Sequence, residues 1–263
     1  MTDWVKRAGG CGCAAVLAVI LVVSLVAWLM SYFHVPSPTR TLQPVDAVVP
    51  PAAPEPVALI DVHAPGRTAD ELREWSAPLA ASTDVSGQAL RAYGNAELIA
   101  RDAWPECHLR WNTLAGLGWV ETRHGTYGGS WLKPSNLDAT GRPDPKIVGI
   151  PLDGTNNTVR IEDTDGGLLD GDTEFDRAVG PLQFIPSTWE HFGLDADGDG
   201  VADPQQIDDA ALSAANLLCN NDRDLAVEED WLEAIYAYNN SRDYVTRVAK
   251  AANSYAVPQP ANS

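Results

Sequence analysis

Apolar residues recur every three or four positions through most of the region between residues 86 and 255, which is the spacing of one face of a helix. Ser86 stands before the first run as a suitable N-cap residue. We therefore expect a mostly α-helical domain over 67–256. The runs predict helices at 89–103, 114–121, 207–218, 231–238 and 244–255.

The segment between the second and third of these helices breaks the pattern. Residues 130–176 are rich in Gly, Asp and Pro and show no long alternation of apolar and polar positions. This composition predicts a long irregular loop insertion, in which 158–162 can form a short hairpin arm. Loops of this length in a compact domain are usually functional.

A run of twenty residues without a charged side chain, 14–33, precedes the domain. Its length suits a helix that crosses a bilayer. Lys6 and Arg7 come before the run and the next basic residue is Arg40, so the positive-inside rule places 1–13 in the cytoplasm and the remainder outside. A cleaved signal peptide is the alternative, but the residues after the run offer no small-residue cleavage site. The sequence thus predicts a single uncleaved membrane anchor.

Proline dominates the segment 34–66, which carries eight prolines among Ala, Val and Thr. Such a segment cannot build a core of its own and tends to be extended. We expect a semi-rigid linker that acts as a stalk between the anchor and the domain. The last residues, 257–263, are expected to be a short tail.

The formal net charge is −18, and the basic residues are scattered rather than clustered. Both facts disfavour nucleic acid as a partner, and they disfavour adhesion to anionic lipid.

Four cysteines divide into two pairs. Cys11 and Cys13 lie on the cytoplasmic side of the expected anchor, whereas Cys107 and Cys219 lie in the outer domain. An oxidising compartment permits pairing, so a Cys107–Cys219 disulfide is the simplest expectation. Two free buried thiols are the alternative.

Glu121 is the candidate for chemistry. It shares a helix face with Leu114, Leu117 and Gly118, and burial against such an apolar face raises the pKa of a carboxyl group. A carboxyl of that kind retains a proton for a glycosidic oxygen near neutral pH. The alternative is a surface ion pair of Glu121 with Arg123 or Lys133.

Three motifs in order resemble those of the B-type membrane-bound lytic transglycosylases, in a form that looks actinobacterial. The first is Gly-Trp-Val-Glu-Thr-Arg-His-Gly at 118–125, and the second is Gly-Pro-Leu-Gln-Phe-Ile-Pro-Ser-Thr-Trp at 180–189. The third is Tyr-Asn-Asn-Ser at 238–241. The similarity runs from about 85 to 255 and implies a lysozyme-like fold and activity on peptidoglycan.

The resemblance also implies roles for individual residues. Glu121 matches the family's sole catalytic acid/base, which cleaves the MurNAc–GlcNAc β-1,4 bond and leaves a 1,6-anhydro-MurNAc product without consuming water. Gln183 matches a cleft amide that binds the sugar. Tyr238 and Asn239 match cleft positions near the acid, and Tyr244 matches a further family tyrosine.

Two other functions remain open at this point. Ordinary glycosidases use two carboxylates, so an acid from 153–176 facing Glu121 would indicate a lysozyme-like hydrolase. A non-catalytic protein that binds wall glycans is the alternative from another class. The retention of both Glu121 and Gln183 argues against it.

An acidic segment at 195–209 resembles the start of an EF-hand calcium loop, with carboxylates at positions 1, 3 and 5 and Gly200 at position 6. Gln206 stands at position 12, where a glutamate is usual. In the resembled family the loop is longer, and its closing aspartate matches Asp209. A solvated acidic turn at the start of the next helix is the alternative. The resemblance implies a structural Ca²⁺ held by Asp195, Asp197, Asp199, the Val201 carbonyl and Asp209.

Together these features predict an enzyme of the bacterial cell membrane with a single-pass anchor and a catalytic domain that faces the cell wall. Its expected partners are peptidoglycan glycan strands and, through the anchor, the membrane, with no nucleic acid. The sequence gives no oligomeric state.

Overall fold

The computed structural model describes residues 41–127, 134–156 and 158–261. The contacts divide the chain into Met1–Gln43 and a compact domain, Pro44–Ser263. The anchor predicted at 14–33 lies outside the described residues. Among the helices that are described, none has the length and apolar character needed to cross a membrane.

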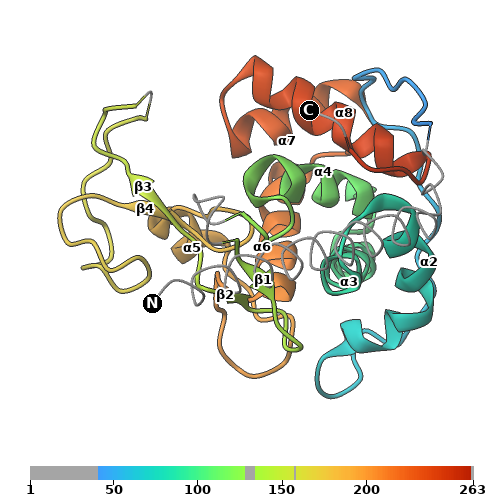
Figure 1. Ribbon diagram of the computed structural model, residues 1–263, viewed down its shortest axis with the longest axis horizontal. Helices are drawn as coiled ribbons and strands as arrows, with labels where there is room; N and C mark the ends of the chain where they lie inside the picture. Colours follow the sequence, from blue (N-terminus) through green and yellow to red (C-terminus); the bar gives the residue numbers. More distant parts are fainter. Residues whose placement is uncertain (1–40, 128–133, 157, 262–263) are drawn as a thin grey trace, which may run out of the picture. The chain divides into compact units, whose positions relative to one another are not determined.

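The described part of the domain is mostly helical (Figure 1). Short 3-10 turns lie at Thr68–Leu72, Pro105–Cys107 and Asn220–Asp222. The α-helices are α2 (Arg73–Thr83), α3 (Gly87–Ala103), α4 (Trp111–Thr122), α5 (Pro186–Phe192), α6 (Ile207–Cys219), α7 (Glu228–Tyr238) and α8 (Arg242–Ala256).

The helices predicted from apolar spacing correspond to α3, α4, α6, α7 and α8. The N-cap prediction is also confirmed, because the Ser86 hydroxyl accepts a hydrogen bond from the Ala89 amide at 3.2 Å. The sequence reading missed α2 and α5. The first contains Pro78 in its interior, and the second is only seven residues long and begins at Pro186.

The core is built from two close helix pairs, α3 against α6 and α4 against α8. Gly116 allows the second pair to approach, because a Cβ atom there would lie 2.8 Å from the Val248 carbonyl oxygen. Helix α6 is buried along nearly all its length and lies between α3 and α5 (Figure 1). Trp111 and Trp231 are among the largest fully buried side chains of the described core.

A smaller lobe lies beside the helices and carries most of the predicted loop insertion (Figure 1). It contains strands that the sequence reading missed, because each is only two to four residues long. The predicted hairpin arm at 158–162 takes part in two isolated bridges, Asp153–Arg160 and Glu162–Phe175. The antiparallel strand pairs are β1 (Asn136–Leu137) with β2 (Pro143–Asp144) and β3 (Val148–Pro151) with β4 (Arg177–Val179).

The linker prediction is wrong for part of 34–66. Residues 48–57, here called the strap, pack on the helical domain instead of forming a stalk, and Val57 is buried. Asn253 accepts the Ala52 amide at 2.9 Å and donates to the Val48 carbonyl at 2.8 Å. Trp111 donates its indole N–H to the Glu55 carbonyl at 2.9 Å.

The physical reason lies in the backbone of the strap. A proline-rich segment makes no regular hydrogen bonds of its own, so its carbonyl groups remain available to side-chain donors. Trp75, Trp111, Asn112 and Asn253 supply these donors from α2, α4 and α8.

The predicted disulfide is confirmed. Cys107 and Cys219 are bonded, with their Cα atoms 5.4 Å apart and the two residues 112 positions apart in the sequence. The bond joins the turn before α4 to the end of α6. It therefore ties together the two helix pairs of the core.

Candidate active site

Glu121 lies in the last turn of α4, at the position predicted for the catalytic acid. Most of α4 is buried, and the Glu121 side chain is itself partly buried. Burial raises the pKa of the Glu121 carboxyl from its ordinary value of 4.5 to about 7. The Glu121 carboxyl can therefore hold its proton close to neutral pH.

Tyr244 is the direct partner of Glu121. Its hydroxyl donates a hydrogen bond to Glu121 Oε1 at 2.5 Å, and the close packing of α4 on α8 brings the two side chains together. This bond favours the ionised carboxylate and lowers the pKa of Glu121, as does the charge of Arg247. Desolvation outweighs both effects.

Tyr238 extends the site from Tyr244 toward the second sequence motif. The two tyrosine rings are stacked, with centroids 6.5 Å apart and planes 9° from parallel. The Tyr238 hydroxyl donates to the Leu182 carbonyl at 2.7 Å, and its ring packs against Phe184. Tyr238 thus combines a packing role with a place next to the candidate acid.

The turn at 180–184 is held against the end of α4. The Thr122 hydroxyl donates to the Pro181 carbonyl at 2.5 Å, which ties the residue after Glu121 to this turn. Gly180 has a positive φ of 77°, and a Cβ atom there would lie 1.7 Å from the Pro204 carbonyl oxygen. Only glycine fits this position without displacing the backbone.

Gln183 occupies the left-handed region with a φ of 50° and is partly buried. Its side-chain amide donates to the Gly180 carbonyl at 3.1 Å, which leaves the amide oxygen without a hydrogen bond from the described residues. Gln183 and Tyr238 also line a cavity of about 70 Å³. The amide oxygen is therefore available to a donor on a ligand.

Asn239 follows the end of α7 and is exposed. Its backbone amide bonds to the Ile235 carbonyl at 3.0 Å, and its side chain has no hydrogen bond within the described part of the chain. The structure thus gathers Glu121, Tyr244, Tyr238 and the 180–184 turn, whereas the Asn239 side chain is not fixed among them.

His124 is a residue of this site that the sequence reading did not assign. Its ring is buried between two tyrosine hydroxyls, with Nδ1 3.1 Å from Tyr93 and Nε2 2.8 Å from Tyr255. Burial lowers the pKa of His124 to about 3, so the ring is neutral and does not serve as a proton donor at neutral pH. A Cβ atom at Gly118 would lie 2.1 Å from the Tyr93 oxygen, so the glycine in the motif makes room for this network.

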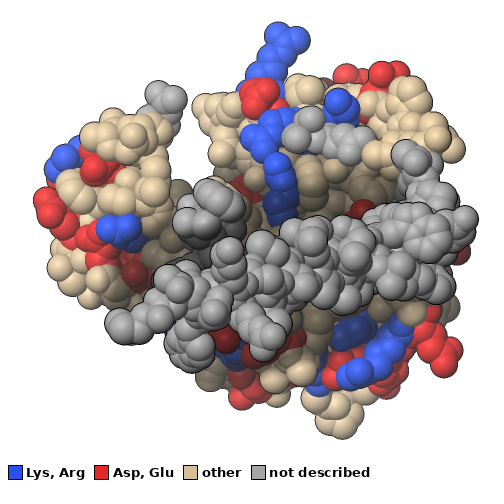
Figure 2. Space-filling view, viewed as in Figure 1, with Lys and Arg blue, Asp and Glu red and all other residues tan. Residues whose placement is uncertain are grey.

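The acids of the loop insertion are engaged within their own lobe. Asp172 pairs with Arg177 at 2.8 Å, and Asp176 accepts bonds from Thr164. Within the described residues, the groups that shift the pKa of Glu121 are Tyr244 and Arg247, and no carboxylate is among them. Figure 2 shows an open gap between this lobe and the helical body, partly covered in this view.

The acidic loop at 195–209 brings together three of its five predicted ligands. Carboxylate oxygens of Asp195, Asp197 and Asp209 lie within 4.8 Å of one another. Asp199 is not in this group, because it is exposed and pairs with Arg142 at 3.2 Å. Val201 is 62% exposed, and the role expected for its backbone carbonyl stays a prediction.

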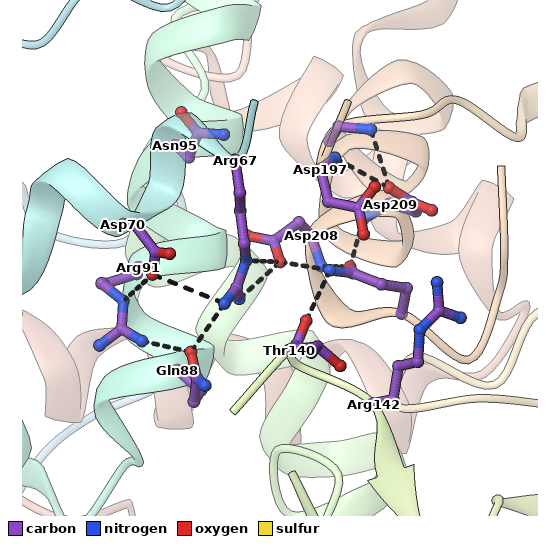
Figure 3. A network of polar contacts seen from close by, with 12 residues as sticks. Arg67, Asp70, Gln88, Arg91, Asn95, Thr140, Arg142, Asp197, Asp208 and Asp209 are labelled. Atoms are coloured by element: carbon purple, nitrogen blue, oxygen red, sulfur yellow. Dashed lines mark hydrogen bonds and ion pairs between the residues drawn. The ribbon is translucent and has the colours of Figure 1, made fainter. Parts of the chain in front are cut away.

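Asp209 is the buried member of this group. Burial raises the pKa of Asp209 to about 7 against the bonds it accepts from the amides of Ala196 and Asp203, and the charge of Asp197 adds to the increase. Figure 3 shows Asp197 and Asp209 side by side, whereas the neighbouring Asp208 points to Arg67. Asp208 and Arg67 form a buried ion pair at 2.7 Å. The three oxygen donors fit a hard cation such as Ca²⁺ in ligand type.

A second group of carboxylates was not singled out from the sequence. Asp163, Asp165 and Asp176 lie close enough to share one ion. Each accepts hydrogen bonds from its own loop.

Comparison with known protein families gives a match to the family described as Transglycosylase SLT domain, over residues 174–224. The matched segment includes the 180–184 turn, α5, the acidic loop and α6, and it ends before α7. No curated protein and no solved structure matches the chain.

The fold and the match support the same class of protein. The mostly helical domain fits the lysozyme-like superfamily, and the matched segment supports an enzyme of lytic transglycosylase type that acts on peptidoglycan.

Proposed function

We propose that this protein is a membrane-anchored lytic transglycosylase of the B type. It cleaves the MurNAc–GlcNAc β-1,4 bond and leaves a 1,6-anhydro-MurNAc end. The observation that carries this proposal is the environment of Glu121. One partly buried carboxyl with a pKa of about 7 is hydrogen-bonded to Tyr244, and no second carboxylate of the described residues influences it.

A pKa near the working pH allows one group to act as acid and then as base. In the first step, protonated Glu121 donates its proton to the glycosidic oxygen while the bond from that oxygen to C1 of MurNAc breaks. In the second step, the C6 hydroxyl of the same sugar forms a bond to C1, and the Glu121 carboxylate accepts the hydroxyl proton. The proton balance closes without water, so Glu121 returns to its starting state.

The other residues of the site orient this reaction. Tyr244 holds one oxygen of Glu121, which leaves the second oxygen for the substrate. The Gln183 amide oxygen suits the N–H of an N-acetyl group. Tyr238 and Asn239 are proposed to line the same cleft.

Mass spectrometry of muropeptides tests the proposal. Full-length protein in detergent is incubated with purified peptidoglycan, and Glu121→Gln is compared with Glu190→Gln, which changes an exposed glutamate of α5. We expect anhydro-muramyl products from the wild type and from Glu190→Gln, and none from Glu121→Gln. Products that gain a water would instead support a lysozyme-like hydrolase, and no release by folded wild type would favour a glycan-binding protein.

We further propose that the acidic loop holds a structural Ca²⁺. Asp195, Asp197 and Asp209 are the ligands that already lie together, and Asp199 and the Val201 carbonyl would complete the set. The ion would supply positive charge to carboxylates that otherwise repel one another. Isothermal titration with Ca²⁺ tests this, with Asp197→Asn as the weakened variant.

Residues 14–33 are proposed to anchor the protein in the cell membrane, with the domain on the wall side. The supports are the uncharged run and the basic residues before it. Fractionation of cells that express the full chain or 34–263 tests the anchor. Equal membrane association of both forms would contradict it.

A further inference from the structure

Two basic residues that have no acidic partner among the described residues, Arg123 and Arg247, lie near Glu121. The protein has 36 acidic and 18 basic residues, so an arginine that lacks an ion pair is unexpected. Within the described residues, none of the acids forms an ion pair with Arg123 or with the basic residues of α8, which are Arg242, Arg247 and Lys250. Figure 2 shows a run of Lys and Arg side chains across the helical body beside the open gap.

Arg123 is held in a fixed place at the end of α4. It is the C-cap residue with a positive φ of 53°, two positions after Glu121. Its guanidinium lies 4.0 Å from the centre of the Trp119 ring and donates a hydrogen bond to the Trp119 carbonyl. The stacked geometry leaves the other N–H groups of Arg123 available.

Arg247 approaches the same place from α8. It follows Tyr244 by three positions, which puts it on the same side of the helix as the tyrosine that contacts Glu121. It is exposed. Its charge lowers the pKa of Glu121 and, after burial, is the largest influence that lowers the pKa of Arg123. Arg123 follows Glu121 by two positions, and Arg247 lies one helical turn after the tyrosine that contacts Glu121. Neither arginine forms an ion pair with an acid of the described residues.

We propose that Arg123 and Arg247 form a carboxylate-binding subsite of the active site, which holds a carboxylate attached to the muramic acid unit. This inference rests on the proposed function. Guanidinium groups bind carboxylates through paired hydrogen bonds, and a stacked arginine loses little freedom when it does so. The uncleaved substrate carries such groups at two sources, the stem peptide and the lactyl arm of a peptide-free muramic acid.

The subsite has a consequence for the chemistry. A bound carboxylate offsets the positive charge that lowers the pKa of Glu121, so the complex retains the catalytic proton to higher pH than the free enzyme. The pH profile of kcat is then expected to extend further to the alkaline side than that of kcat/KM, which reports the free enzyme.

Steady-state kinetics on defined glycan strands tests the subsite. The full-length protein in detergent is assayed as wild type, Arg247→Gln, Arg247→Lys and the control Lys250→Gln, which alters another exposed cation of α8. For peptide-bearing strands we expect Arg247→Gln to raise KM by about 10-fold, the size expected for a charged hydrogen bond. Arg247→Lys should recover part of the loss, and Lys250→Gln should match the wild type.

Two modified substrates identify the source of the carboxylate. The same variants are assayed on two kinds of strand. In the first, the carboxyl groups of the stem peptide are amidated. In the second, the peptide is removed, so the lactyl carboxylates are free. If the KM difference between wild type and Arg247→Gln vanishes on amidated strands, the stem peptide is the ligand. If it persists on stripped strands, the lactyl carboxylate is the ligand.

The inference is overturned if Arg247→Gln has the KM of the wild type on every substrate. The wild-type comparison of native with amidated strands needs no variant, so the test does not depend on the folding of Arg247→Gln. If Arg247→Gln releases anhydro products with the KM of the wild type, the subsite is refuted and the proposed function stands. Absence of anhydro products from the wild type would remove the proposed function itself.

Discussion

Glu121 and Asp209 are two carboxyl groups of one domain whose pKa values are both raised to about 7, yet their surroundings differ. Among the described residues, Glu121 has one hydrogen-bond donor, Tyr244, and its charged neighbour is Arg247. Asp209 accepts three backbone amide bonds and has another carboxylate, Asp197, beside it.

The comparison shows that a raised pKa alone does not define a role. At Glu121, desolvation raises the pKa of a carboxyl group whose second oxygen accepts no hydrogen bond from the described residues. Such a group suits the transfer of a proton. At Asp209, desolvation and repulsion by the charge of Asp197 both raise the pKa. A bound cation would offset the repulsion. Partners, rather than the pKa value, separate a proton donor from a candidate metal ligand.

The largest expected effect comes from changing Glu121, with a substitution in the acidic loop as the comparison. Glu121→Gln should lower the rate of anhydro-product release by about 10²–10⁴-fold, because it removes the acid/base group. Asp197→Asn, which weakens the acidic loop without touching Asp209, should lower the rate less than 10-fold at saturating Ca²⁺. Quantitative mass spectrometry of released muropeptides measures both. Equal losses of rate in the two variants would contradict the assignment of different roles to Glu121 and the acidic loop.

The next effect is thermal stabilisation by Ca²⁺. At 100 times its dissociation constant a ligand stabilises the folded protein by about 2.7 kcal/mol, which corresponds to several degrees in Tm. The proposed Ca²⁺ site requires ionised Asp209, so the increase in Tm should be larger at pH 8 than at pH 5.5. Scanning calorimetry with Ca²⁺ or a chelator measures it, and Asp197→Asn should show a smaller increase. A Ca²⁺ effect independent of pH would contradict the assignment of Asp209.

A smaller effect is expected from Tyr244→Phe. Loss of the hydroxyl removes a hydrogen bond to the ionised carboxylate, so the pKa of Glu121 rises further. The alkaline limb of the rate profile should move to higher pH, with the maximum rate lowered about 10-fold by poorer orientation of Glu121. Rates between pH 5 and 9 measure the shift, and Tyr236→Phe on the exposed side of α7 is the control. A shift to lower pH would contradict the role of the bond.

The smallest expected effect concerns stability rather than activity. The pKa of Glu121 is raised in the folded state, so the folded protein holds a proton that the unfolded chain releases between about pH 4.5 and 7. The contribution of Glu121 to stability therefore falls as pH rises through this window. Glu121→Gln removes this dependence, so its Tm should exceed that of the wild type more at pH 8 than at pH 5. Parallel Tm differences at all pH values would show that Glu121 titrates normally.

Much of the helical fold was readable because its signal is local. Apolar spacing located α3, α4, α6, α7 and α8, and two cysteines in the expected outer domain gave the disulfide. Helix α2 was not predicted because Pro78 interrupts its apolar pattern. The strands were not predicted because they are too short to show an alternation of apolar and polar residues.

The sequence by itself determined the candidate acid, the acidic loop and the order of the motifs, since each depends on neighbouring residues. The tertiary structure alone decided that Tyr244 meets Glu121, that the strap packs on α4 and α8, and that Asp199 turns to Arg142. These contacts join residues that are far apart in the sequence, and they depend on how closely helices pack. A Cβ atom at residue 116 would lie 2.8 Å from the Val248 carbonyl oxygen, so the glycine there lets α8 pack closely on α4, the helix pair that brings Tyr244 to Glu121.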